Sequence, residues 1–181
     1  MAWIAETHED AAEGPLKDVY ARVVRALGRV IPFYRAYSVS PAHLDAHLDF
    51  YERLGRIGAL SKQRRELIAV AVSAENGCRH CTALHAGFLR AHKVEERVVA
   101  ALAADPGAAL DAGAVTGPDA AILRYALKLT RAPRTMTRAD VEALRGHGCS
   151  DGEVFEVAFT TAYFNYTNRV AEGLGVEPEP A

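Results

Sequence analysis

The sequence is poor in cysteine and has no long apolar run. Three of its 181 residues are cysteine, and no stretch approaches the roughly 18 apolar residues that a membrane-spanning helix needs. Residues 1–6 contain neither a basic nor an apolar region, so we predict no signal peptide. These absences favour a cytoplasmic protein with no membrane partner. In the cytosol thiols stay reduced, so closely spaced cysteines there are expected to serve catalysis or metal binding.

Basic charge is not concentrated anywhere in the chain. The formal net charge is −2, and acidic and basic residues are interspersed. There is no block of Lys and Arg and no basic stripe interleaved with aromatic residues, so we predict no nucleic-acid partner. The sequence also lacks a Gly-rich phosphate loop, an internal repeat and any run that alternates apolar and polar residues. We therefore expect no β-sheet and no cofactor.

The residues that are present favour an all-α fold. Half of the chain is hydrophobic, with many Ala, Leu, Arg and Glu residues, which suits helices packed around a sizeable core. The length predicts a single all-helical domain over residues 1–181. Its apolar helix faces exceed what one small bundle needs to bury, so we expect a homo-oligomer, either a dimer, a trimer or a hexamer.

Apolar periodicity and capping residues predict the helices and their limits. The predicted helices are 14–31, 41–58, 62–76, 78–91, 95–104, 118–131, 137–146 and 151–173. We expect Pro32 to stop the first helix. The Gly- and Ala-rich segment 105–118 is predicted to be a loop and a possible boundary, with the C-terminal helices following over 118–173. The tail, 176–181, is predicted to be disordered.

One short stretch, Glu75 to His85, concentrates the reactive residues. Cys78, Cys81 and His85 are spaced i, i+3 and i+7, so on a helix they lie along one face. Cysteines in a first helical turn meet unpaired N–H groups and the positive end of the dipole, which stabilise a thiolate. A thiolate can attack a peroxide, and a second thiol one turn away can condense with the resulting sulfenic acid to form a disulfide.

Such a cycle needs a route for protons. His85 is one turn beyond Cys81 on the same face, so it can act as the base. Glu66 lies on the preceding helix, which is joined to the cysteine helix through Gly77. At about 1.5 Å rise per residue, Glu66 and His85 should stand within a turn of the same height and face each other. We therefore predict a proton relay of His85 and Glu66.

These residues carry a family resemblance. In order and spacing they match the Glu…Cys-x-His-Cys-x-x-x-His signature of the alkylhydroperoxidase AhpD-like proteins of the carboxymuconolactone decarboxylase superfamily: Glu66, Cys78, His80, Cys81 and His85. The core of the resemblance covers about residues 44–104. Residues 163–169 and the chain length look like the uncharacterised peroxidase-related branch of these proteins.

The resemblance implies a fold and an activity. It implies an all-α bundle built on a central helical hairpin that assembles into oligomers, and thiol-dependent reduction of hydroperoxides. Cys81 would be the peroxidatic thiol, Cys78 the resolving thiol, His85 and Glu66 the relay, and His80 a supporting polar residue. The partners implied are a hydroperoxide substrate and an unidentified thiol or disulfide electron donor.

Other interpretations of the same cluster stay open. Cys78 and Cys81 could be buried structural thiols, or with His80 and His85 they could hold a metal in a redox-sensing or zinc-binding module. Four ligands crowded on one helix start are unusual for zinc, so we expect no metal. A lactone decarboxylase-like enzyme with incidental cysteines is the third alternative, although the decarboxylases of the superfamily lack the Cys pair.

The remaining candidates carry weaker signals. His43 and His47 are one turn apart but have no evident third ligand, so we expect solvated or capping roles. Cys149 has no partner in sequence and is expected to be a lone thiol. A polar cluster interrupts the apolar final helix: Asn165, Asn168 and Arg169. It is expected to be solvated at the helix end, or alternatively to line an interface or a pocket.

Overall fold

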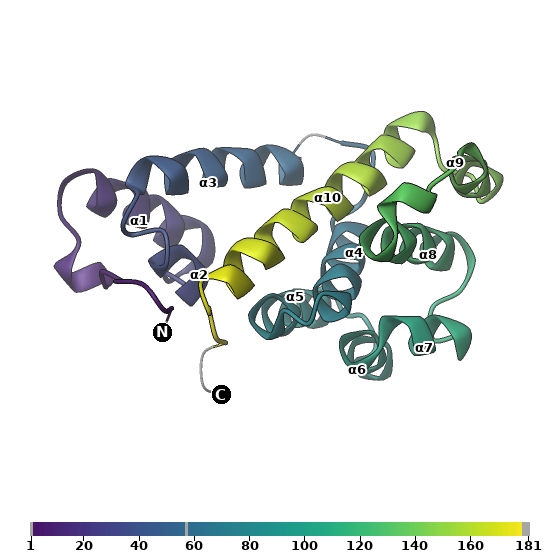
Figure 1. Ribbon diagram of the computed structural model, residues 1–181, viewed down its shortest axis with the longest axis horizontal. Helices are drawn as coiled ribbons and strands as arrows, with labels where there is room; N and C mark the ends of the chain where they lie inside the picture. The colour runs from purple at the N-terminus through teal and green to yellow at the C-terminus, as the bar shows by residue number, and fades with distance from the viewer. Residues whose placement is uncertain (1, 57, 179–181) are drawn as a thin grey trace. The chain divides into compact units, whose positions relative to one another are not determined.

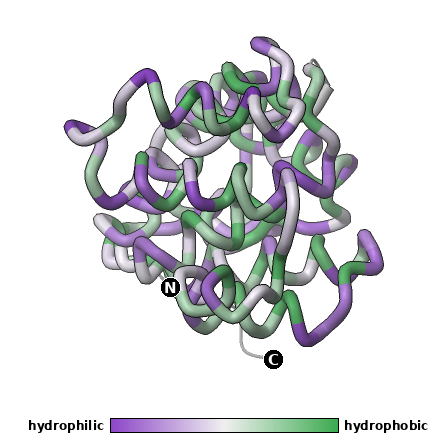
Figure 2. Tube along the Cα trace, turned by 90° about the vertical axis from the view of Figure 1, so that its right-hand side faces the viewer, coloured by the Kyte–Doolittle hydropathy of each residue, from purple (hydrophilic) through white to green (hydrophobic). Residues whose placement is uncertain are grey.

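All regular structure is helical. The computed structural model describes residues 2–56 and 58–178, and within that part of the chain there are helices and no strand (Figure 1). The elements are η1 (Glu9–Ala11), α1 (Gly14–Leu27), α2 (Pro32–Arg35), α3 (Pro41–Arg56), α4 (Lys62–Glu75), α5 (Arg79–Ala91), α6 (Glu96–Ala104), α7 (Pro106–Asp111), α8 (Gly117–Arg131), η2 (Pro133–Thr135), α9 (Arg138–Gly146) and α10 (Asp151–Gly173). Hydrophobic and hydrophilic residues are interspersed along the trace (Figure 2), as expected for helices that bury one face. The all-α prediction is confirmed.

The chain divides into two compact units. One consists of Met1–Ile57 with Val170–Ala181, and the other is Gly58–Arg169. Within the first unit α1 packs against α3, and within the second α4 packs against α5, α6, α7 and α8. Every residue of the predicted motif lies in the second unit, so its geometry can be described there alone. That the whole chain folds as one domain stays a prediction.

A helical hairpin of α4 and α5 forms the centre of the second unit. Ser61 caps α4 by accepting a hydrogen bond from the Arg64 N–H at 3.2 Å. The apolar second half of α4 is buried throughout, from Leu67 to Ser73, because helices cover it on several sides. Gly77 then reverses the chain with a φ of +71°, a conformation that glycine adopts without a steric penalty. The predicted hairpin is present.

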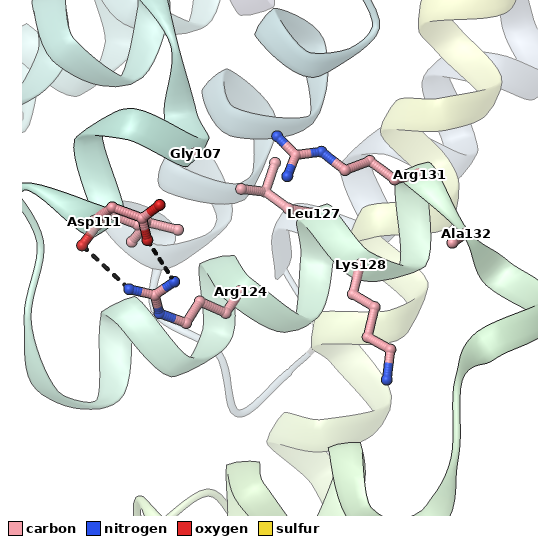
Figure 3. A pocket seen from close by; sticks show the side chains of 8 residues that line it. Gly107, Asp111, Arg124, Leu127, Lys128, Arg131 and Ala132 are labelled. Atoms are coloured by element: carbon pink, nitrogen blue, oxygen red, sulfur yellow. Dashed lines mark hydrogen bonds and ion pairs between the residues drawn. The ribbon is translucent and has the colours of Figure 1, made fainter.

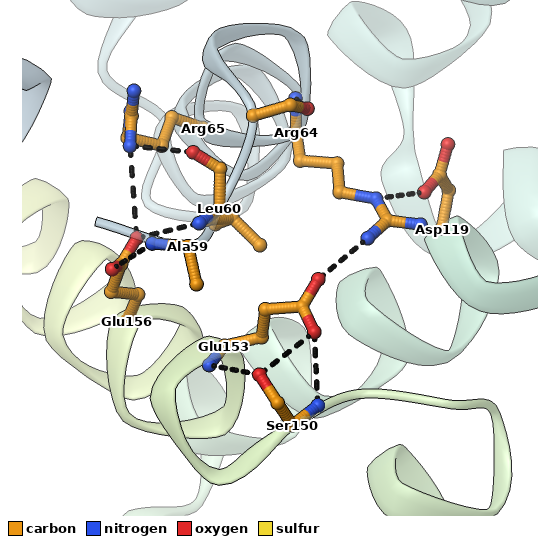
Figure 4. Close-up of polar contacts among 9 residues, drawn as sticks. Ala59, Leu60, Arg64, Arg65, Asp119, Ser150, Glu153 and Glu156 are labelled. Atoms are coloured by element: carbon orange, nitrogen blue, oxygen red, sulfur yellow. Dashed lines mark hydrogen bonds and ion pairs between the residues drawn. The ribbon is translucent and has the colours of Figure 1, made fainter.

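The segment that leads into α4 is fixed by a carboxylate of α10. Glu156 accepts hydrogen bonds from the N–H groups of Ala59 at 2.6 Å and Leu60 at 2.9 Å (Figure 4). The Arg65 guanidinium lies 3.7 Å from the same carboxylate. A Cβ atom at Gly58 would overlap this carboxylate, so a larger residue there would displace the Glu156 side chain. These contacts fix the segment before α4 relative to α10. They thereby help to fix the position of Glu66 along the hairpin.

A second carboxylate of α10 forms a neighbouring network. Glu153 makes the predicted capping box with Ser150, since each backbone N–H is bonded to the other side chain. The Arg64 guanidinium bridges Glu153 at 3.1 Å and Asp119 at 2.7 Å (Figure 4). These ion pairs connect α4, α8 and α10 around the start of α10.

The first helix is shorter than predicted. It ends at Leu27, because Gly28 adopts the left-handed conformation with φ +78° and donates its N–H to Val24. Val30 and Ile31 are buried outside a helix. Pro32 begins α2 instead of stopping α1, because a proline at the first helical position has no N–H to lose.

Two predictions for irregular segments are wrong. Residues 105–118 contain α7, which Asp105 caps by accepting from the Ala108 N–H at 2.9 Å, and this segment lies inside the second unit instead of separating two units. Val176, predicted to begin a disordered tail, is buried and donates its N–H to Ala171 at 2.9 Å. Residues 179–181 of the predicted tail lie outside the described residues.

Candidate active site

The two cysteines stand at the start of α5, at the exit of the hairpin turn. Gly77 donates its N–H to Ala74 at 3.0 Å, and Cys78 donates its N–H to Ser73 at 2.9 Å. This pair of bonds is a Schellman motif, which ends α4 and leads directly into α5. Cys78 is the N-cap of α5, and Cys81 follows in the first turn. Both are buried.

His85 and Glu66 meet across the hairpin. The distance between His85 Nδ1 and Glu66 Oε2 is 2.6 Å, and the two side chains are 8% and 15% exposed. The predicted facing of the two side chains is therefore observed. Because Glu66 engages Nδ1, the second ring nitrogen of His85, Nε2, is the one left to exchange a proton with another group. The relay itself stays a prediction.

Aromatic rings hold His85 from two sides. Phe164 of α10 packs edge-to-face on the imidazole with a centroid separation of 4.7 Å, and Phe88 does so at 5.5 Å. These contacts constrain the plane of the imidazole ring. The sequence pattern does not assign Phe164 to the site, because a phenylalanine in an apolar helix is also typical of ordinary core packing.

His80 lies in the first turn of α5 between the two cysteines. Its side chain is buried, with 5% of the residue exposed. A plain surface histidine at a helix start is therefore not what the structure shows. The structure places His80, like Cys78, Cys81 and His85, among the buried residues of this region.

The polar cluster of α10 is not solvated as a whole. Asn168 is 1% exposed, and its side-chain amide donates to Ser73 Oγ at 3.0 Å. Asn165 donates to Thr130 Oγ1 at 2.9 Å, whereas Arg169 is exposed. The expectation of helix-end solvation is wrong for Asn168, because it faces the turn before Cys78. The one polar residue in the apolar run of α4, Ser73, was the signal that could have indicated this contact.

Two of the remaining candidate residues, Cys149 and His47, are also buried. Cys149 precedes α10, and burial raises the pKa of its thiol, with the Glu153 carboxylate adding to the rise. His47 is buried beside the rings of Phe33 and Tyr37 at centroid separations of 5.4 and 5.5 Å, and burial lowers its pKa to about 4. The expected solvated role is therefore wrong for His47. His43 matches the capping expectation, with Nδ1 2.6 Å from the hydroxyl of the residue before α3.

A hollow of about 340 Å³ lies elsewhere in the second unit, between α7 and α8. Arg124, Lys128 and Arg131 line it, and Figure 3 shows Arg124 turned towards Asp111, which it meets at 3.0 Å. Arg131 binds Glu75, the last residue of α4, at 2.6 Å. The cations of the hollow are thus neutralised by carboxylates, and one of them supports the hairpin turn.

Across residues 2–56 and 58–178, no group of three or more His, Cys, Asp or Glu side chains is arranged to hold a metal ion. None of the helices in this part of the chain is both long enough and apolar enough to cross a membrane.

The fold and the hairpin site define an AhpD-like, all-helical protein. The sequence profile of the carboxymuconolactone decarboxylase family matches residues 41–132, and the chain belongs to this family. The match includes the predicted core, 44–104, and extends through α8. No curated protein matches the chain.

Solved structures with the same fold cover nearly the whole chain. One is described as the alkylhydroperoxidase AhpD core of an uncharacterised peroxidase-related protein from Ralstonia eutropha JMP134, with 27% identity, a TM-score of 0.86 and coverage of 98% of this chain and 92% of that one. Another peroxidase-related protein, from Silicibacter sp. TM1040, has 28% identity, a TM-score of 0.87 and the same coverage. The apo debrominase Bmp8 shares the fold at 16% identity and a TM-score of 0.79, covering 96% and 90%. The family and the two peroxidase-related structures support an enzymatic role of the AhpD type.

Proposed function

We propose that the protein is a thiol-dependent, peroxidase-type oxidoreductase that reduces hydroperoxides through Cys78 and Cys81. The observation that carries the proposal is the 2.6 Å contact between His85 Nδ1 and Glu66 Oε2, one turn beyond Cys81 on the helix that both cysteines begin. A buried histidine oriented by a carboxylate can transfer protons where water does not reach. The identity to peroxidase-related proteins supports the same class of enzyme.

In the first step the Cys81 thiolate attacks the terminal oxygen of the hydroperoxide. A sulfur–oxygen bond forms and the oxygen–oxygen bond breaks, so Cys81 becomes a sulfenic acid. The sulfur loses two electrons, and the hydroperoxide gains them and leaves as an alkoxide. His85, having taken the thiol proton, returns it to the alkoxide to give the alcohol.

In the second step the Cys78 thiolate attacks the sulfur of the sulfenic acid. The disulfide forms, the sulfur–oxygen bond breaks, and the hydroxide that leaves receives from His85 the proton that the Cys78 thiol gave up on ionising, which makes it water. The helix start favours the thiolate of both residues, because its N–H groups and dipole stabilise negative charge. A thiol donor then supplies two electrons and two protons to return the disulfide to the dithiol.

The test is to count thiols after reaction with a hydroperoxide. Reduced protein is mixed with one equivalent of tert-butyl hydroperoxide, quenched, and titrated under denaturing conditions. We expect three thiols per chain to fall to one, with mass spectrometry locating a Cys78–Cys81 disulfide. If all three thiols persist while hydrogen peroxide also leaves them intact, the proposal fails.

Single substitutions assign the two steps. Cys81→Ser should abolish the reaction, and Cys78→Ser should stop it at a sulfenic acid that dimedone traps on Cys81. Cys149→Ser is the matched control, because this buried thiol should not take part; it should still lose two thiols per chain.

The proposal extends to the partners and the assembly. The electron donor would be a thiol, either of a small molecule or of a protein dithiol that becomes a disulfide, and the chain would act as a homo-oligomer in the cytoplasm. Sedimentation of the purified protein measures the oligomeric state directly, and a monomer at micromolar concentration would contradict this part.

A further inference from the structure

A buried amide network joins α10 to the turn that precedes Cys78. The Asn168 side chain donates to Ser73 Oγ at 3.0 Å and accepts at its Oδ1 from the Asn76 amide at 2.9 Å. Asn168 and Ser73 are almost fully buried. Buried polar groups are costly unless they are bonded, so a network of this kind constrains the groups that it joins.

The network continues away from the turn. The Asn76 amide also donates to Asn165 Oδ1 at 3.1 Å. Asn165 is fixed in turn by Thr130 of α8, whose hydroxyl oxygen accepts at 2.9 Å, and by the Arg169 guanidinium, which donates to its Oδ1 at 2.8 Å. The Asn76 side chain is therefore held by two residues of α10 that have supports of their own.

These side-chain hydrogen bonds involve two residues of the Schellman motif, Ser73 and Asn76. Ser73 is the residue whose carbonyl accepts the Cys78 N–H at 2.9 Å, and Asn76 is the C-cap of α4. Asn168 binds the side chains of both. Movement of either residue would move the backbone of Cys78, because only Gly77 separates Asn76 from Cys78.

We infer that Asn168 is a positioning residue for the dithiol: by tying Ser73 to Asn76 it holds Cys78 where its sulfur can bond to that of Cys81. The inference deepens the proposed function and rests on it only for the use of the Cys pair in turnover. A disulfide tolerates a narrow range of separations between its two Cα atoms. Fixing Cys78 thus raises the effective concentration of one thiol at the other.

The test measures disulfide stability without a hydroperoxide. Wild type, Asn168→Leu and Asn76→Ala are equilibrated in graded mixtures of reduced and oxidised dithiothreitol, and the Cys78–Cys81 disulfide is quantified by mass spectrometry. We expect each substitution to lower the equilibrium constant for the disulfide about tenfold, which is about 30 mV for a two-electron couple. Asn76 is only half-buried, so Asn76→Ala carries the test if Asn168→Leu does not fold.

Thr167→Val is the matched control. Thr167 is adjacent to Asn168 and buried, but its hydroxyl donates to Phe164 within α10 at 3.2 Å. The variant loses a buried hydrogen bond without touching the turn, so its stability should fall while its redox equilibrium stays at the wild-type value. A general loss of stability would shift all three variants alike.

The outcomes separate this inference from the proposed function. If the folded Asn168 and Asn76 variants keep the wild-type equilibrium within twofold, or if the wild type forms no disulfide in any mixture, the inference is overturned. If the wild-type disulfide forms and the variants weaken it, but hydroperoxide leaves the thiols intact, the positioning role stands and the peroxidase proposal fails.

Discussion

At the scale of single residues, the site depends on one contact between two helices. His85 is oriented by the Glu66 carboxylate on one side and by the Phe164 ring on another. The place of Cys81, one turn before His85, follows from helix geometry. Removal of this contact is the direct test of the predicted proton relay.

Substitution of the relay should slow the first oxidation step. His85→Gln should lower the rate at which hydroperoxide oxidises Cys81 by roughly 100-fold, because general acid–base catalysis contributes about 10²–10⁴-fold. Glu66→Gln keeps the shape and should cost about tenfold, since the ring remains but loses the charge that orients it. Stopped-flow fluorescence or quenched thiol counting measures both.

The control for the relay is Glu142→Gln, which changes an α9 carboxylate whose side chain is 47% exposed. It should react at the wild-type rate. A His85→Gln variant as fast as the wild type would remove His85 from the mechanism, even if the disulfide still formed.

At the scale of elements, α10 contacts both the segment before α4 and the last turn of α4. Glu156 fixes the N–H groups of Ala59 and Leu60 ahead of α4, and Asn168 holds Ser73 near its end. The sequence of α4 specifies a buried helix but does not say what anchors it. The position of α4, which brings Glu66 to His85, therefore depends on contacts with α10 between residues that are about ninety apart in sequence.

Removal of the Glu156 carboxylate should destabilise the second unit. Glu156→Ala leaves two backbone donors without their acceptor, which should lower the free energy of unfolding by about 2 kcal/mol. Glu156→Gln keeps one acceptor oxygen and should lose less. Urea denaturation gives the free energies, and hydrogen exchange should show the Ala59 and Leu60 amides losing protection in Glu156→Ala.

Glu142→Ala serves as the surface control, since exposed ion pairs contribute only about 0–1 kcal/mol. Wild-type stability in Glu156→Ala, with both amides still protected, would show that solvent replaces the carboxylate without loss.

At the scale of the whole molecule, local patterns account for most of the helices. Caps and proline positions identified α4, α8 and α10 closely, because a cap acts within a few residues. Apolar periodicity predicts a first helix that continues through Val30 and Ile31, but these residues are buried outside the helix, which ends at Leu27. The Gly and Ala content of residues 105–118 predicts a loop, whereas the structure has α7 there, capped by Asp105.

The buried His47 should make stability depend on acid. Its folded-state pKa of about 4 lies below the ordinary value of 6.5, so between these values the unfolded chain binds a proton that the folded chain does not. Above pH 6.5 the titration of His47 does not change the free energy of unfolding. As the pH falls through 6.5 towards 4, it lowers this free energy, by about 2 kcal/mol at pH 5. Unfolding free energies of the wild type and His47→Phe at pH 7 and pH 5 measure this.

His47→Phe should lose about 2 kcal/mol less than the wild type between the two pH values. His92→Gln, which replaces an exposed histidine, should follow the wild type. Equal losses in the wild type and in His47→Phe would show that His47 does not govern the acid response.

The sequence by itself determined what depends on neighbours along the chain. The all-α class, the Gly77 turn, the helix start at Cys78 and the spacing to His85 all follow from interactions within about two helical turns. The short turn at Gly77 also predicts that Glu66 and His85, 19 residues apart, face each other. The tertiary structure decided which more distant groups meet, such as Ser73 with Asn168, 95 residues apart. The burial of Asn168 and His47 was not visible in the sequence, because a polar side chain on a helix has the same local pattern whether water or another helix faces it.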